Sequence, residues 1–184
     1  PQPLRRMKFI TFWFDPVSPY AWLAFDQLPR AMEGISHCVE YRPVLFAGLL
    51  KHWGQKGPAE IEPKRQWTFR ECAWPARYVV ESVFRHAWQG GGDPNDPERL
   101  ARLTQTLAPQ RDPGGESVKA QLRSSTERAV QAGVFGVPTL EVDGLQFWGA
   151  DALPMLQAAL KGDPWFASGA WDAAAAPRDG VQRR

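Results

Sequence analysis

Hydrophobic residues dominate the stretch from Lys8 to Phe14, whose sequence is KFITFWF. A near-continuous apolar run of this length predicts a central strand that is buried on both faces. A helical pattern then starts at Ser18-Pro19 and continues to about Met32, with serine at the N-cap and proline at the first helical position. Alternation over His37 to Val44 predicts a second strand. Strand, helix and strand in this order predict a parallel βαβ unit.

The periodicity changes to a helical one after residue 45. Residues 47–53 form a short helical or irregular piece, and helices are predicted over residues 63–74, 77–88, 97–107 and 117–132. The loop from Gln89 to Pro97 is rich in glycine, but it lacks the Gly-Lys-Ser/Thr ending of a phosphate-binding loop. The pattern therefore predicts an all-helical block in the middle of the chain.

Asp143-Gly144 is the best hairpin turn in the sequence, because this dipeptide favours the tight turns that join antiparallel strands. It lies between two predicted strands, Thr139 to Val142 and Leu145 to Trp148. A last helix opens at Gly149-Ala150-Asp151 and ends near residue 160. The chain beyond residue 166 is rich in alanine, glycine and serine, which predicts a disordered tail over residues 167–184.

The predicted order is βαβ, then a helical insertion, then ββα. This order is the layout of a thioredoxin-like fold that carries an all-helical insertion, so we predict an α/β protein of that class. Residues 8–45 and 134–166 would form the thioredoxin-like domain, and residues 46–133 would form the insertion.

Composition narrows the functional classes. The chain has 184 residues, of which 43% are hydrophobic, and its nine tryptophans indicate an aromatic-rich core. The net charge is +2 and charges of both signs are interspersed, so nothing demands a nucleic-acid partner. The apolar runs are too short to span a membrane and no secretory signal is visible, so we expect a cytoplasmic protein with no membrane partner.

Cys38 and Cys72 are far apart and form no Cys-x-x-Cys motif. Neither a redox dithiol nor a zinc site is indicated, and both residues are interpreted as packed or incidental thiols. The three histidines lack the spacing of metal ligands and no Ser-His-Asp set is legible, so no metal site is expected.

Ser18 is the first candidate for chemistry, because it lies where the first predicted strand gives way to the first helix. A hydroxyl at the positive end of a helix, at the carboxyl-terminal edge of a sheet, suits an anionic or thiolate ligand. The alternative is that Ser18 only caps its helix.

Val137-Pro138, just before the third predicted strand, is the second candidate. Proline cannot donate to the sheet, and an X-Pro bond in this place is a candidate cis peptide, although the sequence does not reveal the isomer. The N–H and C=O groups of Val137 would then be unpaired and able to bind an extended peptide ligand. The alternative is an ordinary edge-strand proline.

Ala150 and Asp151 begin the last predicted helix and form the third candidate. Their N–H groups would face a ligand carboxylate at the positive helix end, while Asp151 could accept a cationic amine. The alternative is that Asp151 only complements the helix dipole.

Weaker candidates follow the second predicted strand. Lys51, Lys56 and Lys64 could meet a substrate carboxylate or could be solvated charges. His52 could be a general base or a ligand, or simply pack at the surface. Trp53 could form an aromatic wall for a planar substrate, or could belong to the core.

Several segments resemble one known family. The segment from Phe12 to Ala24, FWFDPVSPYAWLA, resembles the start of 2-hydroxychromene-2-carboxylate isomerases, which belong with kappa-class glutathione transferases in the DsbA-like branch of the thioredoxin fold. Four further segments agree, namely Tyr41 to Phe46 (YRPVLF), His52 to Ile61 (HWGQKGPAEI), Gly133 to Thr139 (GVFGVPT) and Phe147 to Asp151 (FWGAD). The matches span about residues 8–166 and are together far more specific than any one of them.

The resemblance implies glutathione as cofactor, with Ser18 in place of the redox cysteine of the oxidoreductase relatives and hydrogen-bonded to the glutathione sulfur. Val137, before Pro138, would pair with the glutathione backbone. Ala150 and Asp151 would hold its γ-glutamyl end. In the family reaction the thiolate adds to a conjugated system, a bond rotates and the thiolate leaves, which interconverts 2-hydroxychromene-2-carboxylate and trans-o-hydroxybenzylidenepyruvate.

The resemblance also implies a role in the breakdown of aromatic compounds and a homodimer. Lys51, His52 and Trp53 would lie on the substrate side. The Ser18-Pro-Tyr-Ala segment contains no thiol, so disulfide exchange is disfavoured.

The chain departs from the family between Trp74 and Tyr78. A longer stretch is expected there, with a Pro-Phe-Asn-Pro-Leu type segment and a further helix, so either the insertion is shortened or residues are missing. That stretch would help to wall the substrate cavity. Two alternatives therefore stay open: a kappa-like glutathione transferase that conjugates an electrophile, and a thioredoxin-fold binding protein without chemistry.

Overall fold

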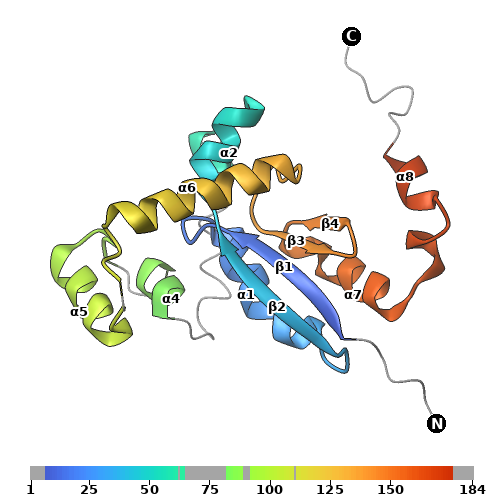
Figure 1. Ribbon diagram of the computed structural model, residues 1–184, viewed down its shortest axis with the longest axis horizontal. Helices are drawn as coiled ribbons and strands as arrows, with labels where there is room; N and C mark the ends of the chain where they lie inside the picture. Colours follow the sequence, from blue (N-terminus) through green and yellow to red (C-terminus); the bar gives the residue numbers. More distant parts are fainter. Residues whose placement is uncertain (1–6, 62, 65–81, 89–91, 110, 176–184) are drawn as a thin grey trace.

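A mixed sheet forms the centre of the computed structural model, which describes residues 7–61, 63–64, 82–88, 92–109 and 111–175 (Figure 1). Four strands lie in it in the order β2 (His37–Pro43), β1 (Lys8–Phe14), β3 (Thr139–Val142) and β4 (Leu145–Trp148). β1 is parallel to β2 and antiparallel to β3, and β3 is antiparallel to β4. The predicted parallel βαβ unit and the two later strands are confirmed.

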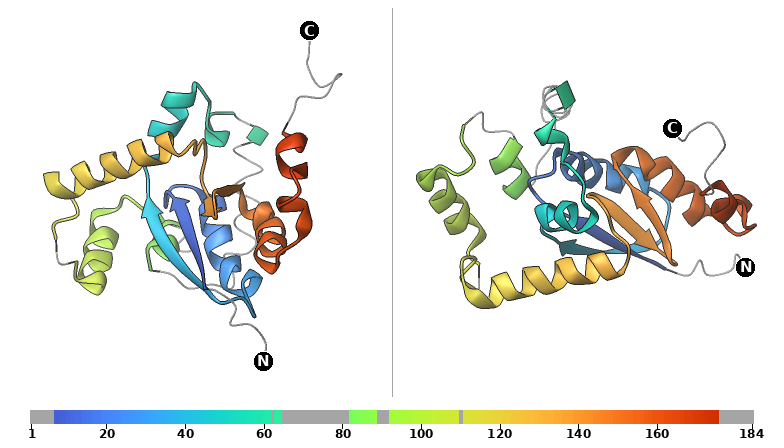
Figure 2. Two further views of the ribbon diagram at one scale, coloured as in Figure 1. Left: turned by 45° about the vertical axis from the view of Figure 1, so that its right-hand side comes forward. Right: turned by 90° about the horizontal axis from the view of Figure 1, so that it is seen from above.

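Helices cover both faces of the sheet (Figure 2). α1 (Pro19–Ala31) and α7 (Leu153–Lys161) pack on one face, and α6 (Glu116–Gln131) packs on the other. Successive residues of β1 point to opposite faces, so Phe12 packs toward α1 and α7 while Trp13 packs toward α6. The apolar run in β1 is nearly continuous because these two residues are buried from opposite sides.

The chain turns between β3 and β4 as the sequence predicts. Asp143 and Gly144 have φ values of 49° and 80°, the positive values that a type I′ turn requires at both central positions. The turn aligns the hairpin so that Leu140 faces Phe147, and both side chains are buried. The register of β3 against β4 therefore follows from a local dipeptide and a shared core.

Between β2 and α6 the described chain is helical. Its elements are α2 (Phe46–Trp53), η1 (Pro58–Glu60), α4 (Ser82–Trp88) and α5 (Pro97–Leu107). Of the helices predicted over residues 63–74 and 77–88, only residues 63–64 and 82–88 are described, and these are helical. The expected shortening between residues 74 and 78 lies outside the described residues, and the boundaries of the two predicted domains stay predictions.

The segment after α7 differs from its prediction. Instead of a disordered tail from residue 167, the structure places a short helix, α8 (Ala170–Ala174), after η4 (Pro164–Phe166). The reason is aromatic packing, because the Trp171 ring lies 5.6 Å from that of Phe147 and 5.5 Å from that of Phe166. The disorder prediction is wrong over residues 170–174, while residues 176–184 lie outside the described part.

Cys38 lies exposed on β2 as a free thiol, so of the two interpretations it is an incidental thiol and not a packed one. Cys72 lies outside the described residues. No helix in the described part of the chain is both long and apolar enough to cross a membrane, and the cytoplasmic location stays a prediction.

Candidate functional site

Ser18 caps α1 and also faces a second loop. Its hydroxyl oxygen accepts a hydrogen bond from the Ala21 N–H at 3.3 Å, as the sequence predicts for an N-cap residue. The same hydroxyl donates to the Val137 carbonyl oxygen at 3.1 Å, across 119 residues of chain. Ser18 is only 3% exposed, so its hydroxyl lies at a buried junction between two loops.

The second loop, residues 134–138, carries the cis peptide bond between Val137 and Pro138. We call it the cis-proline loop. The candidate cis bond is thus present. The prediction that the Val137 carbonyl is unpaired is wrong, because the buried Ser18 hydroxyl needs an acceptor and uses this oxygen. The Val137 N–H has no acceptor among the described residues, so this donor is available to a ligand.

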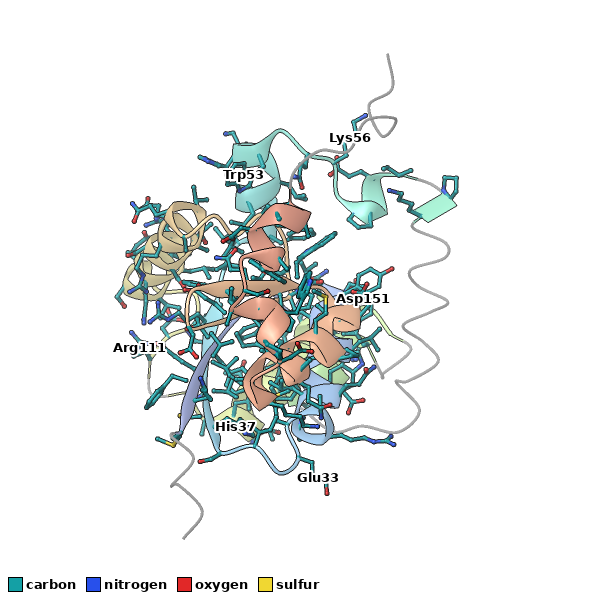
Figure 3. The ribbon with its side chains drawn as sticks, turned by 90° about the vertical axis from the view of Figure 1, so that its right-hand side faces the viewer. Glu33, His37, Trp53, Lys56, Arg111 and Asp151 are labelled. Carbon is teal, nitrogen blue, oxygen red and sulfur yellow. The ribbon has the colours of Figure 1, made fainter. Side chains whose placement is uncertain are left out.

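The third candidate adjoins the first two. The Gly149 N–H donates to the Pro138 carbonyl at 3.0 Å, which ties the short helix η3 (Ala150–Ala152) to the cis-proline loop. Ala150 packs against the apolar cluster at the start of α1 that includes Ala21. Asp151, whose side chain is labelled in Figure 3, is exposed and lies in η3, directly before α7 in the chain. The structure therefore brings Ser18, the cis-proline loop and the start of η3 to one place.

The site is equipped for an extended ligand with an anionic group. A hydroxyl caps the positive end of α1, a backbone N–H lies beside it, and the first N–H groups of η3 have no partner inside that helix. Ser18-Pro-Tyr-Ala supplies no thiol, so the protein's own residues here cannot form a disulfide.

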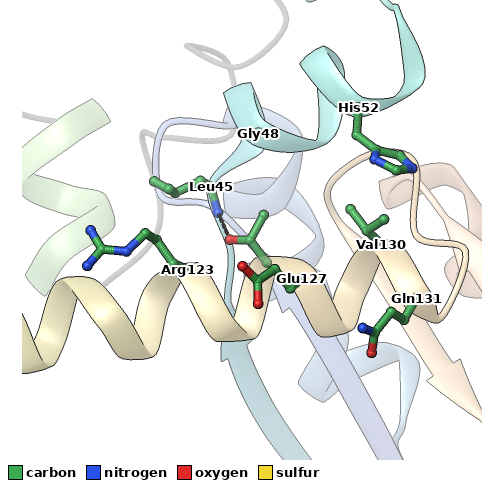
Figure 4. A pocket seen from close by; sticks show the side chains of 8 residues that line it. Leu45, Gly48, His52, Arg123, Glu127, Val130 and Gln131 are labelled. Atoms are coloured by element: carbon green, nitrogen blue, oxygen red, sulfur yellow. Dashed lines mark hydrogen bonds between the residues drawn. The ribbon is translucent and has the colours of Figure 1, made fainter.

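The three residues predicted on the substrate side are exposed on α2 and are divided between two places. The Trp53 ring nitrogen donates to the Val134 carbonyl at 3.0 Å, so this side chain holds the cis-proline loop. The His52 ring lies toward α6 instead, at an open pocket of about 370 Å³ between α2 and α6 (Figure 4). Within the described part of the chain, no hydrogen bond or ion pair joins the Lys51 side chain to either place.

Several residues around the site are absent from the sequence-based candidates. Asp15 accepts hydrogen bonds from the backbone N–H groups of Val17 and Phe46 at 3.0 and 2.8 Å. Trp88 of α4 donates its ring N–H to the Pro16 carbonyl at 3.2 Å. For the contacts of Asp15, the only local signal in the sequence is an Asp-Pro pair before a helix. No sequence pattern reveals the contact of Trp88 with Pro16.

An exposed aromatic pair joins the cis-proline loop to β4. The rings of Phe135 and Trp148 lie 5.0 Å apart. The Trp148 indole lies so close to Gly136 that a Cβ atom at that glycine would be 2.5 Å from the ring nitrogen. In the sequence, Gly136 and Trp148 stand out only as parts of segments that resemble the family, because their contact joins residues from different elements.

Two named relatives align with most of this chain. It is 27% identical to a 2-hydroxychromene-2-carboxylate isomerase of Sphingobium xenophagum, over 83% of this chain and 98% of the relative. It is 24% identical to glutathione S-transferase kappa 1 of Rattus norvegicus, over 86% of this chain and 92% of the relative. The first alignment has 191 positions but includes only 83% of the 184 residues of this chain. Some segments of the relative therefore have no counterpart in this chain.

Solved structures agree on the fold. A 2-hydroxychromene-2-carboxylate isomerase superposes with a TM-score of 0.70 at 18% identity, covering 91% of this chain and all of that one. A probable DsbA oxidoreductase of Streptomyces coelicolor gives 0.54 at 15% identity, covering 85% of this chain and 91% of that one. These likenesses confirm the predicted thioredoxin-like fold with a helical insertion.

A family model supports the same assignment from sequence. The model of the DSBA-like thioredoxin domain matches residues 68–161, which is more than half of the chain. Since the fold, the relatives and this match agree, the chain belongs to the DSBA-like thioredoxin domain family.

Proposed function

We propose that the protein is a glutathione-dependent isomerase that interconverts 2-hydroxychromene-2-carboxylate and trans-o-hydroxybenzylidenepyruvate, or acts on a related aromatic substrate. The observation that carries the proposal is the buried Ser18 hydroxyl, 3.1 Å from the carbonyl of the residue before the cis-proline. A hydroxyl at this position can bind a ligand's sulfur, but it cannot exchange disulfides. The Sphingobium relative, matched over nearly its whole length, carries the isomerase name.

The residues of the site fit glutathione. The Val137 N–H, which has no acceptor among the described residues, suits a carbonyl of the tripeptide backbone. The N–H groups at the start of η3 suit the γ-glutamyl carboxylate, and the exposed Asp151 carboxylate suits its amine. When bound, glutathione would supply a thiol that adds reversibly to the conjugated system of the substrate.

Ser18 would change one of its two hydrogen bonds when the site fills. Its oxygen can continue to accept from the Ala21 N–H. Its single hydrogen serves the Val137 carbonyl in this structure and would turn to the ligand sulfur. A donor at the positive end of α1 favours the ionised sulfur over the neutral thiol, so the sulfur would be more nucleophilic at neutral pH.

The substrate would approach from the side of α2. Trp53 is 43% exposed although its ring nitrogen is bound, so its ring can still contact an aromatic substrate. Lys51 is exposed on the same helix and would supply positive charge to a substrate carboxylate, and the exposed His52 would be a general base or a ligand. We also propose a homodimer, which light scattering would test.

A kappa-like glutathione transferase is the second candidate, and the match to the rat kappa-class enzyme favours it. A transferase would release a covalent adduct and consume glutathione, whereas an isomerase would regenerate it. A binding protein without chemistry is the non-enzyme alternative.

Calorimetry with glutathione, followed by an ultraviolet assay on the chromene substrate, tests these candidates. Binding followed by interconversion at constant glutathione concentration supports the isomerase. Binding with loss of glutathione and an adduct in the mass spectrum supports the transferase. Absence of glutathione binding contradicts both enzymes and leaves the binding protein.

A further inference from the structure

The two ends of α2 contact the two loops of the site. At its start, the Phe46 N–H donates to Oδ2 of Asp15 at 2.8 Å, while the Val17 N–H donates to Oδ1 of the same carboxylate at 3.0 Å. The Ser18 N–H also donates to the Asp15 backbone carbonyl, at 2.9 Å. Asp15 therefore joins α2 to the turn formed by residues 15–18, which we call the Ser18 turn.

The far end of α2 contacts the cis-proline loop. Trp53 donates its ring N–H to the Val134 carbonyl at 3.0 Å. One turn earlier, the fully buried Leu49 packs in one cluster with Val134 and Val137. Phe46 and Trp53 are seven residues apart, so about 10 Å of helix separates the two contacts.

α2 is itself fixed against α6. The Leu45 N–H, just before the helix, donates to Oγ1 of Thr126 at 2.8 Å, a contact that Figure 4 shows. The two helices approach closely at Gly48, where a Cβ atom would lie 3.2 Å from Cγ2 of Thr126. A helix held along its side by α6 can keep its two ends at a constant separation.

We propose that α2 sets the separation of Ser18 and Val137, with Asp15 and Trp53 as the positioning residues at its two ends. The inference rests on the proposed function for its catalytic meaning, because Ser18 and Val137 are the residues that would bind glutathione. Trp53 would thus act through the cis-proline loop, whether or not its ring also contacts the substrate. Asp15 would act through the Ser18 turn.

Hydrogen exchange of backbone amides tests the proposal without any ligand. Asp15→Asn keeps the shape of the side chain but leaves one oxygen to accept from two N–H groups. Trp53→Phe keeps an aromatic ring but loses the N–H donor. Asp163→Asn is the matched control, because Asp163 also accepts from a backbone N–H, that of Trp165 at 2.9 Å, but belongs to the segment after α7.

We expect each substitution to speed amide exchange also in the loop that the substituted residue does not contact. Trp53→Phe should make the amides of Val17 and Ser18 exchange roughly three to ten times faster, the range expected for a modest loss of local stability. Asp15→Asn should do the same for the amide of Val134. The Asp163→Asn control should change neither loop.

The direct Ser18–Val137 hydrogen bond is a competing route between the loops. The measurement is therefore repeated in Ser18→Ala, where that bond is absent. Persistence of the Trp53→Phe effect on residues 17 and 18 supports α2 as the spacer. The proposal is overturned if that effect is lost. It is also overturned if each variant changes exchange only in the loop that its substituted residue contacts. Because no glutathione is added, either result is independent of whether the proposed function holds.

A second measurement ties the spacing to the site. The ratio of the dissociation constants of S-methylglutathione and glutathione reports the contact between Ser18 and the free thiol. We expect Asp15→Asn and Trp53→Phe to lower this ratio roughly three- to tenfold, while Asp163→Asn leaves it unchanged. A ratio equal to that of the unsubstituted protein in both variants would show that α2 does not position Ser18.

Discussion

Replacing Ser18 by alanine should raise the pKa of the thiol of bound glutathione by about 1 to 2 units. The magnitude follows from the two hydrogen bonds of the hydroxyl. The donation to the Val137 carbonyl is 3.1 Å long, beyond the usual 2.7–2.8 Å for hydroxyl donors, so breaking it costs about 0.5 kcal/mol. A hydrogen bond to an ionised acceptor contributes about 1.5–3 kcal/mol, and 1.36 kcal/mol corresponds to one pKa unit.

The assay is a pH titration of thiolate absorbance with glutathione bound. Ser125→Ala is the matched control, since Ser125 is similarly buried (5% exposed) but lies on α6. The Ser18→Ala protein should also lose about 1 kcal/mol of unfolding free energy, because the cap of α1 is lost. A thiol pKa that is the same in both alanine variants and in the unsubstituted protein would refute the reasoning, whatever the change in stability.

Three further predictions concern other parts of the fold. Burial raises the pKa of Asp26, so the unfolding free energy should fall as the pH rises past the ordinary carboxyl range. Thermal melting should therefore show Asp26→Asn to be more stable than the unsubstituted protein at pH 7 and equally stable in acid. Gly136→Ala should displace the Trp148 indole and weaken glutathione binding, measured by calorimetry, and unchanged affinity would contradict a role for that contact. Trp171→Ala should release the segment after α7 from Phe147, so limited proteolysis should cleave it faster, whereas cleavage at the parental rate would argue against the aromatic docking.

The sequence predicts features that depend on neighbouring residues. Ser18 is a helix cap because serine followed by proline favours a helix start wherever it occurs. Asp143-Gly144 forms its turn because few other dipeptides adopt two positive φ values. Val137-Pro138 is a candidate cis peptide because this X-Pro bond lies just before a predicted strand, while the isomer itself required the structure.

The features that the sequence did not reveal join residues that are far apart in the chain. Ser18 and Val137 are separated by 119 residues, and Trp53 and Val134 by 81, so no local pattern indicates either hydrogen bond. The segment after α7 was mispredicted for the same reason, because its alanine-rich composition hides the packing of Trp171 on the sheet. Composition describes what a segment contains, but not which surface it meets.

The central claim is that Ser18 binds the sulfur of glutathione and favours its ionised form. The most direct measurement is calorimetric titration of glutathione at neutral pH in two buffers of different ionisation enthalpy, which counts the protons released on binding. We expect the unsubstituted protein to bind glutathione with proton release and Ser18→Ala to bind it with clearly less. Absence of binding, or equal proton release by the two proteins, would contradict the claim.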